Sequence, residues 1–174
     1  MKLAVARARY YDANHFGPDG GDALAWVPIK LGRITVKIPN TEGRRRAVRF
    51  HDLHHIVTGY QTDVPGESEI AAWELASGCT RWPAATVLNL AGLAFGILVW
   101  PKRCARAWAL GRHTKNLYRE DDVAPLLDRE VDDVRRELGL GVAKVPVRAA
   151  DVATLLGFLA AAPFVILWSF VADR

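Results

Sequence analysis

Histidine and acidic side chains crowd into one short stretch of the chain, between Arg49 and Gly78. His51 and His55 are four residues apart. At about 100° of rotation per residue in a helix, their rings lie on one face, one turn apart. His-x-x-x-His on a helix is a common way to offer two imidazole nitrogens to one metal ion. The spacing therefore predicts a metal-binding helix here.

Carboxylates lie where they can complete such a site. Asp52 is on the flank of the same helix face, three residues before His55. A turn over residues 59–66 should fold a second helix back beside the first, and we expect this second helix to begin at Glu67. Glu67 would then reach the two imidazoles, although the helix dipole alone also favours an acidic residue in a first turn.

Structural roles are open to each of these residues. A single histidine on a helix is usually a surface or core residue, and Asp52 could pair with a nearby arginine. Three of the five histidines of the chain, however, lie within five positions and adjoin an aspartate. That concentration favours a metal site, with His54 and Glu74 as candidates for the residues that support the ligands from outside.

A basic cluster precedes the histidines on the same predicted helix. Its members either face solvent or bind anions, and they are Arg44, Arg45, Arg46 and Arg49. Arg49 lies closest to the histidines, so we select it as the candidate to bind a lipid headgroup or an acidic group of a substrate.

His51-Asp52-x-x-His55, followed after eleven residues by Glu67, resembles the signature of the coenzyme Q biosynthesis protein 4 family. The resemblance covers about residues 25–140 and is supported by Thr58-Gly59, Gly66-Glu67, Trp73-Glu74, Gly111-Arg112 and the run VDDVRRELGL. It implies a mostly helical fold, a divalent metal ion and a role in ubiquinone biosynthesis. By the motif, the metal ligands would be His51, Asp52, His55 and Glu67.

Two imidazoles and two carboxylates suit Zn²⁺, Fe²⁺ or Mn²⁺, and the lack of a thiolate disfavours a structural zinc cage. The resemblance implies a lyase reaction, the decarboxylation, with or without oxidation, at ring carbon 1 of a prenylated hydroxybenzoate. The main alternative is a non-enzymatic scaffold that binds prenyl lipid and other quinone-biosynthesis proteins. A zinc hydrolase with Asp52 as base is disfavoured because Asp is one methylene shorter than the usual Glu. An HD-type phosphohydrolase would need an upstream histidine, and only His15 is available.

Composition narrows the classes of protein that fit. The 174 residues are enough for one domain with a core, and half of them are hydrophobic. A net charge of +4 falls short of the dense basic stripe of a nucleic-acid-binding protein, so we expect no nucleic acid partner. Cys79 and Cys104 lack metal-ligand or disulfide-framework spacing, which indicates a reducing compartment.

The predicted fold class is mainly α, a helical metal-binding domain over residues 1–145 with one small N-terminal β-hairpin. Residues 1–25 are expected to be irregular. Trp26–Ile38 alternates as a hairpin does, with its turn at Gly32. Thr41 should cap the first motif helix. Glu120 should open a helix whose apolar residues recur at helical spacing and which ends at Gly139.

Two uncharged runs indicate membrane contact. Residues 82–101 are long enough to span a bilayer, but Asn89, Gly92 and Gly96 favour close packing, so we expect a buried or monotopic helix beside an apolar tunnel for an isoprenoid tail. Residues 152–172 predict a transmembrane helix, kinked at Pro163, within a C-terminal membrane anchor over residues 146–174. The alternative is a helix that forms a homodimer. Lys144 and Arg148 indicate the cytoplasmic face of the inner (plasma) membrane.

Overall fold

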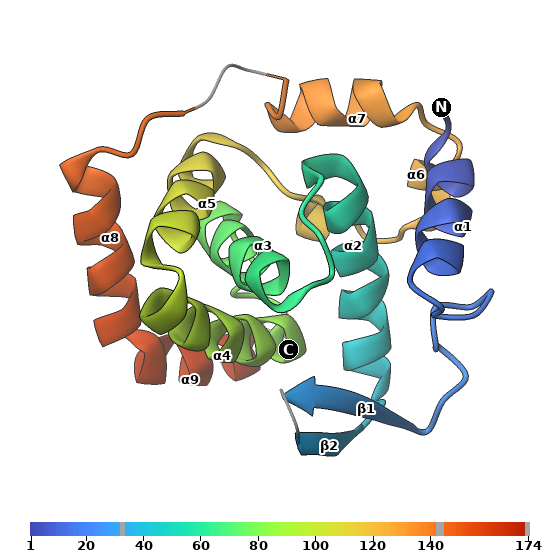
Figure 1. The fold of residues 1–174 in the computed structure, drawn as a ribbon, viewed down its shortest axis with the longest axis horizontal. Helices are drawn as coiled ribbons and strands as arrows, with labels where there is room; N and C mark the ends of the chain where they lie inside the picture. Colours follow the sequence, from blue (N-terminus) through green and yellow to red (C-terminus); the bar gives the residue numbers. More distant parts are fainter. Residues whose placement is uncertain (32–33, 142–144, 173–174) are drawn as a thin grey trace.

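The computed structural model describes residues 1–31, 34–141 and 145–172, which form a mainly helical protein with a two-stranded sheet (Figure 1). Helix α3 lies at its centre, packed against α4 and α5, with α2 alongside. The bounds of these four helices are α2, Glu42–Thr58; α3, Val64–Ser77; α4, Pro83–Val99; and α5, Pro101–His113. The predicted metal motif therefore lies on the two helices α2 and α3.

Shorter elements surround this centre. They are α1 (Leu3–Ala13), the 3-10 helix η1 (Leu117–Arg119), α6 (Ala124–Leu127), α7 (Val131–Leu138), α8 (Ala149–Ala160) and α9 (Ala162–Ala172). Strands β1 (Trp26–Leu31) and β2 (Ile34–Pro39) pair antiparallel from Trp26↔Pro39 to Leu31↔Ile34. The predicted hairpin is confirmed, while the predicted turn residue Gly32 lies outside the described residues, as does Lys144.

The two motif helices begin and end at residues that satisfy their terminal backbone groups. The Thr41 side chain accepts a hydrogen bond from the Arg44 N–H, and Gly59 ends α2 with φ 81°. Asp63 caps α3 by accepting from the Gly66 N–H at 2.8 Å, and Pro65 occupies its first turn. Helix α3 therefore begins at Val64, and the prediction that it begins at Glu67 was three residues late.

Two helices, α1 and α5, were not predicted from the sequence. Residues 1–25 were expected to be irregular, but α1 forms and buries Leu3 and Ala6. Its first residues pair with a distant segment, since the Leu3 N–H donates to the Arg129 carbonyl and the Val131 N–H to the Met1 carbonyl. That pairing holds the backbone around Glu130 extended. The predicted helix from Glu120 to Leu138 is consequently split into α6 and α7.

Small residues bring α4 close to α3, as the glycines in its sequence predicted. A Cβ built on Gly96 would lie 2.4 Å from the Ser68 Cβ and 2.8 Å from the Cys104 Sγ. One built on Gly92 would lie 3.2 Å from the Ala71 Cβ. The face of α4 that contacts α3 is thus closely packed, and Asn89 is buried.

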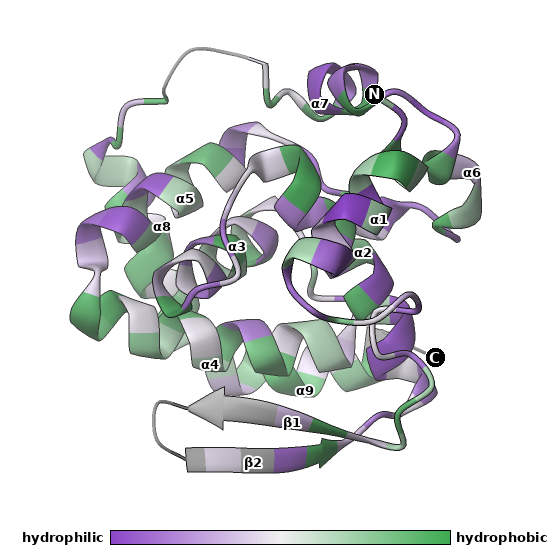
Figure 2. Ribbon diagram, turned by 45° about the vertical axis from the view of Figure 1, so that its right-hand side comes forward, coloured by the Kyte–Doolittle hydropathy of each residue, from purple (hydrophilic) through white to green (hydrophobic). Residues whose placement is uncertain are grey.

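The segment over residues 152–172, predicted as a transmembrane helix kinked at Pro163, forms two helices, α8 and α9. The paired segments Ala149–Ala160 and Ala162–Val171 are bent by 70° at Ala161, with Pro163 in the first turn of α9. No single described helix is long and apolar enough to cross a membrane, although this bent pair together passes that test. Helix α8 packs on α5, and α9 lies along α4, where Figure 2 shows hydrophobic residues on both.

We predict that Gly96→Ala destabilises the protein by about 1–3 kcal/mol, because the added methyl must push α4 away from Ser68 and Cys104. Urea unfolding followed by circular dichroism measures the change. Gly43→Ala in α2 is the control, since nothing lies within 4 Å of its Cβ. Equal stability of the two variants would contradict the close packing of α4 on α3.

Candidate metal centre

Three of the predicted ligands converge on one point between α2 and α3. The Nε2 atoms of His51 and His55 lie 3.1 Å apart. The Glu67 carboxylate oxygens lie 3.5 Å from the His51 Nε2 and 3.3 Å from the His55 Nε2. Among the described residues, these three side chains form the group of ligand atoms close enough together to hold a metal ion.

The opposite nitrogens of both imidazoles are held by acceptors. The His55 Nδ1 lies 2.9 Å from the Tyr60 carbonyl, which can only accept, so this nitrogen carries the hydrogen. The His51 Nδ1 lies 2.9 Å from the Glu74 carboxylate and is held in the same way. Both Nε2 atoms can therefore direct a lone pair at a metal ion held between them and Glu67, as metal-binding histidines do.

Two lone pairs facing each other at 3.1 Å repel unless a proton or a cation lies between them. Burial alone would lower the pKa of His51, but the charge of Glu74 and the hydrogen bond to Glu67 outweigh burial and raise this pKa well above its ordinary value. Burial also opposes the ionisation of Glu67, yet its hydrogen bonds to His51 and His55 lower its pKa to about 2. The centre thus favours positive charge at one point, and a divalent cation fits the donor set.

Glu74 orients this centre from beneath. Its side chain is fully buried, and its Oε1 accepts from the His51 Nδ1 and, at 2.6 Å, from the His54 Nδ1. Its Oε2 accepts from the Asn89 amide at 2.5 Å and from the Tyr118 hydroxyl at 3.0 Å. Burial alone would raise the pKa of Glu74, but the charge of His51 and the hydrogen bonds from His51 and His54 hold this pKa well below its ordinary range.

His54 points away from the metal centre. Its Nε2 accepts a hydrogen bond of 2.9 Å from the Leu117 backbone N–H, so its hydrogen must be on Nδ1, where Glu74 accepts it. Burial lowers the pKa of His54, in keeping with a neutral ring. His54 therefore acts on the centre by fixing Glu74, and it links α2 to η1.

Asp52, the fourth ligand implied by the family motif, has a different partner. The Tyr11 hydroxyl donates to its Oδ2 at 3.0 Å, and burial raises the pKa of this carboxyl to about 6. The neighbouring Tyr10 ring stacks on His55, with ring centroids 5.7 Å apart. Sequence analysis missed both tyrosines because they lie in a segment without a recognisable motif. Asn89 was visible as a polar residue in an uncharged run, but its partner Glu74 was not.

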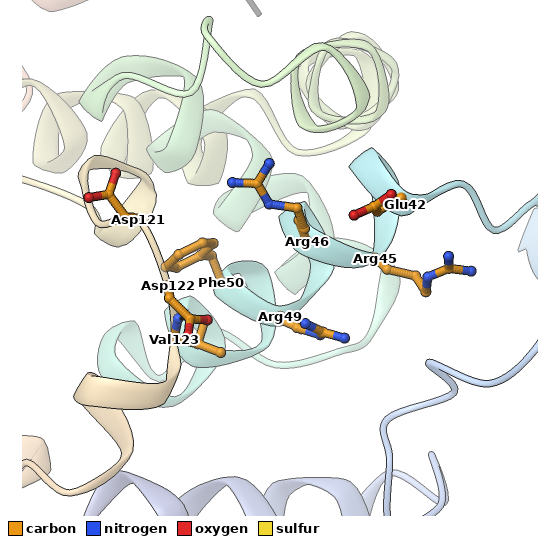
Figure 3. A pocket seen from close by; sticks show the side chains of 8 residues that line it. All are labelled: Glu42, Arg45, Arg46, Arg49, Phe50, Asp121, Asp122 and Val123. Atoms are coloured by element: carbon orange, nitrogen blue, oxygen red, sulfur yellow. Dashed lines mark hydrogen bonds between the residues drawn. The ribbon is translucent and has the colours of Figure 1, made fainter.

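Arg49 lies on another side of α2 from the metal centre. It forms an ion pair with Asp22 and lines a surface pocket of about 370 Å³. Figure 3 shows the lining side chains, which are Glu42, Arg45, Arg46, Arg49, Phe50, Asp121, Asp122 and Val123. Both acidic and basic groups line this pocket, so its charge is mixed. A role for Arg49 in binding an anionic headgroup stays a prediction.

Fold and site together define a helical protein with a candidate centre of two histidines and one glutamate. The chain is 33% identical over 146 residues to the ubiquinone biosynthesis protein coq4, mitochondrial, of Talaromyces marneffei, a match that covers 76% of this chain. It belongs to the coenzyme Q biosynthesis protein 4 family. The matched region spans 44% of the length of that relative. No family model and no solved structure matches the chain.

We predict that Glu74→Gln weakens zinc binding about 10- to 100-fold, because an amide cannot accept hydrogen bonds at both positions and His51 loses its fixed orientation. Competition with a chelating dye measures the affinity. Glu69→Gln on the same helix is the matched control, since Glu69 pairs with Arg103 instead. Equal zinc affinity in the two variants would show that Glu74 does not support the centre.

Proposed function

We propose that this chain acts in ubiquinone biosynthesis as a metal-dependent enzyme that removes the carboxylate at ring carbon 1 of a prenylated hydroxybenzoate. The observation that carries the proposal is the convergence of the His51 and His55 Nε2 atoms with Glu67, each imidazole held from behind by an acceptor. Family membership and the relative, a ubiquinone biosynthesis protein, support the pathway.

His51, His55 and Glu67 would hold Zn²⁺, Fe²⁺ or Mn²⁺. When bound, the ion would supply positive charge that stabilises the electron pair left on the ring as carbon dioxide departs. In the simple decarboxylation, the carbon–carbon bond breaks and a proton takes the place of the carboxylate. The oxidative form would place a hydroxyl there instead, with one oxygen atom from dioxygen, while two electrons from an external reductant and two protons convert the other atom to water; it would need a redox-active metal. The Tyr10 ring covers His55 and excludes water from that side of the centre.

Apolar helix faces support a lipid surface as the source of the prenylated substrate. On α4 the outward face carries Val87, Leu88, Phe95 and Leu98, of which Leu98 is 82% exposed. On α9 the residues packed inward are Ala162, Ile166 and Ser169, and the outward face carries Phe164, Leu167, Trp168 and Val171. A helix that is apolar on both faces is typical of a membrane environment.

Basic residues follow the apolar end of α4. Lys102 and Arg106 are exposed in α5, where they suit anionic headgroups. We propose that the protein lies on the cytoplasmic face of the inner (plasma) membrane, with α8 and α9 as its membrane-contacting segment. Other quinone-biosynthesis proteins are the proposed protein partners, and a homodimer is the alternative use of the same apolar surface.

A scaffold that presents the prenyl lipid without turning it over is the second candidate function. It is favoured by the same exposed faces of α4 and α9, and it needs no intact metal centre. Metal dependence of turnover therefore separates the two functions. Hydrolysis of peptides would instead favour a zinc hydrolase.

We predict that His55→Ala abolishes both metal binding and decarboxylation, because it removes one of three ligand side chains. Elemental analysis of the purified protein measures the metal, and mass spectrometry of a prenylated hydroxybenzoate incubated with it measures turnover. His113→Ala is the control, an exposed histidine at the end of α5. Normal turnover by the His55 variant would exclude the proposed enzyme.

We predict that the double variant Leu98→Asp, Leu167→Asp lowers the partition coefficient onto anionic vesicles at least about 100-fold, since each leucine contributes about 1.5–3 kcal/mol when buried in lipid. Vesicle flotation measures the partition. Leu24→Asp, an exposed leucine before the hairpin, is the control. Unchanged flotation together with conversion of a dimer to a monomer would assign this surface to a homodimer.

A further inference from the structure

Tyr10 and Phe16 form an aromatic wall beside the metal centre. The Tyr10 ring stacks on the His55 imidazole, with ring centroids 5.7 Å apart and 23° between the ring planes. The Phe16 ring packs edge-on against Tyr10, with ring centroids 5.8 Å apart. The centre itself is open to the outside, because the Glu67 side chain is 44% exposed and the His51 side chain 21% exposed. A ligand that reaches the centre from outside therefore meets aromatic side chains next to it, which suits an aromatic ring.

The end of α1 is tied to the turn between α2 and α3, and this places Tyr10 at the centre. The Asn14 side-chain amide donates to the Tyr10 carbonyl at 2.8 Å. The Thr62 hydroxyl donates in turn to the Asn14 side chain at 2.5 Å. Thr62 lies between the two helices that carry His55 and Glu67. These contacts therefore fix the backbone of Tyr10 relative to both of them, independently of any bound metal.

The hydroxyl of Tyr10 is the polar group of this wall. Within the described parts of the chain it has no hydrogen-bond acceptor, whereas the adjacent Tyr11 hydroxyl donates to Asp52 at 3.0 Å. Burial, together with the nearby negative charges of Asp52 and Glu67, raises the pKa of Tyr10 well above its ordinary value. The phenol therefore stays protonated at neutral pH and can offer its hydrogen to a ligand.

An aromatic carboxylate is the kind of ligand for which this donor is most useful. The negative charges of Asp52 and Glu67 repel such a ligand, so it needs attraction beyond that of the cation held at the centre. A hydrogen bond from a neutral phenol to an anionic oxygen is charge-assisted and roughly twice as strong as one between neutral groups. Tyr10 can supply this attraction from a ring that already contacts the centre.

We propose that Tyr10 is a substrate-binding residue whose hydroxyl donates a hydrogen bond to the carboxylate of the aromatic substrate at the metal centre. This rests on the proposed function, because the ligand is the prenylated hydroxybenzoate of that reaction. The bond is lost once the carboxylate has left the ring. Tyr10 thus favours the acid over its decarboxylated product and helps the product to leave.

The test compares the binding of two ligands by Tyr10→Phe, a prenylated hydroxybenzoate and the same prenylated phenol without the carboxylate. Loss of the hydroxyl should weaken binding of the acid about 10- to 100-fold, the factor for a lost hydrogen bond to a charged group. Binding of the phenol should stay within about twofold. Calorimetry of the zinc-loaded protein without dioxygen measures both dissociation constants, and KM replaces that of the acid if it is consumed.

Zinc affinity and the melting temperature separate this role from a structural one. Both should be unchanged in Tyr10→Phe, since the ring that stacks on His55 is kept. Tyr10→Leu also lacks the hydroxyl and should lose the same preference for the acid, which keeps the test open if Tyr10→Phe does not fold. Trp26→Phe, at an exposed aromatic residue of β1, is the control and should bind both ligands as the unchanged protein does.

Two results would overturn the inference. One is binding of the acid by Tyr10→Phe as tight as that by the unchanged protein. The other is equal weakening for the acid and the phenol, which would give Tyr10 a structural role. If the unchanged protein binds neither zinc nor the acid, the proposed function fails and the inference falls with it. Turnover by the unchanged protein confines any failure to Tyr10.

Discussion

The buried carboxylate of Glu74 is the contact on which the rest of the centre depends. Glu74 lies on α3, and its two oxygens accept from four groups on three other elements, namely His51 and His54 of α2, Asn89 of α4 and Tyr118 of η1. A buried charge is costly unless it is fully hydrogen-bonded, so the fold must bring all four donors to it. The same hydrogen bonds thus orient the His51 imidazole toward the metal position and hold the helices together.

Much of the architecture was predictable because local patterns dictate it. The period-2 run of the hairpin, the Thr41 cap and the glycines of α4 each have a single physical explanation, and each was found in the structure. The positions at which helices break were not predictable, because they depend on distant partners. Residues around Glu130 leave the helix since they pair with the N-terminus, which sequence periodicity cannot reveal.

In the metal centre, too, local spacing was predictable and distant contacts were not. The spacing of His51, His55 and Glu67 was enough to predict that these side chains meet, because helix geometry and one short turn determine their relative positions. Spacing could not indicate that Asp52 would face Tyr11, since the tyrosine approaches from α1, 41 residues away in sequence. Residues that act on a centre through others come from elements that no local motif connects to it.

The hydrogen bond from the Leu117 N–H to the His54 Nε2 joins positions 63 residues apart. During synthesis on the ribosome, His54 emerges long before this donor exists. The nascent chain therefore exposes the His54 ring without this partner for some seconds, at translation rates of about 5–20 residues per second. The hydrogen bonds that fix His54 and Glu74 are consequently complete only after Leu117 and Tyr118 have been synthesised.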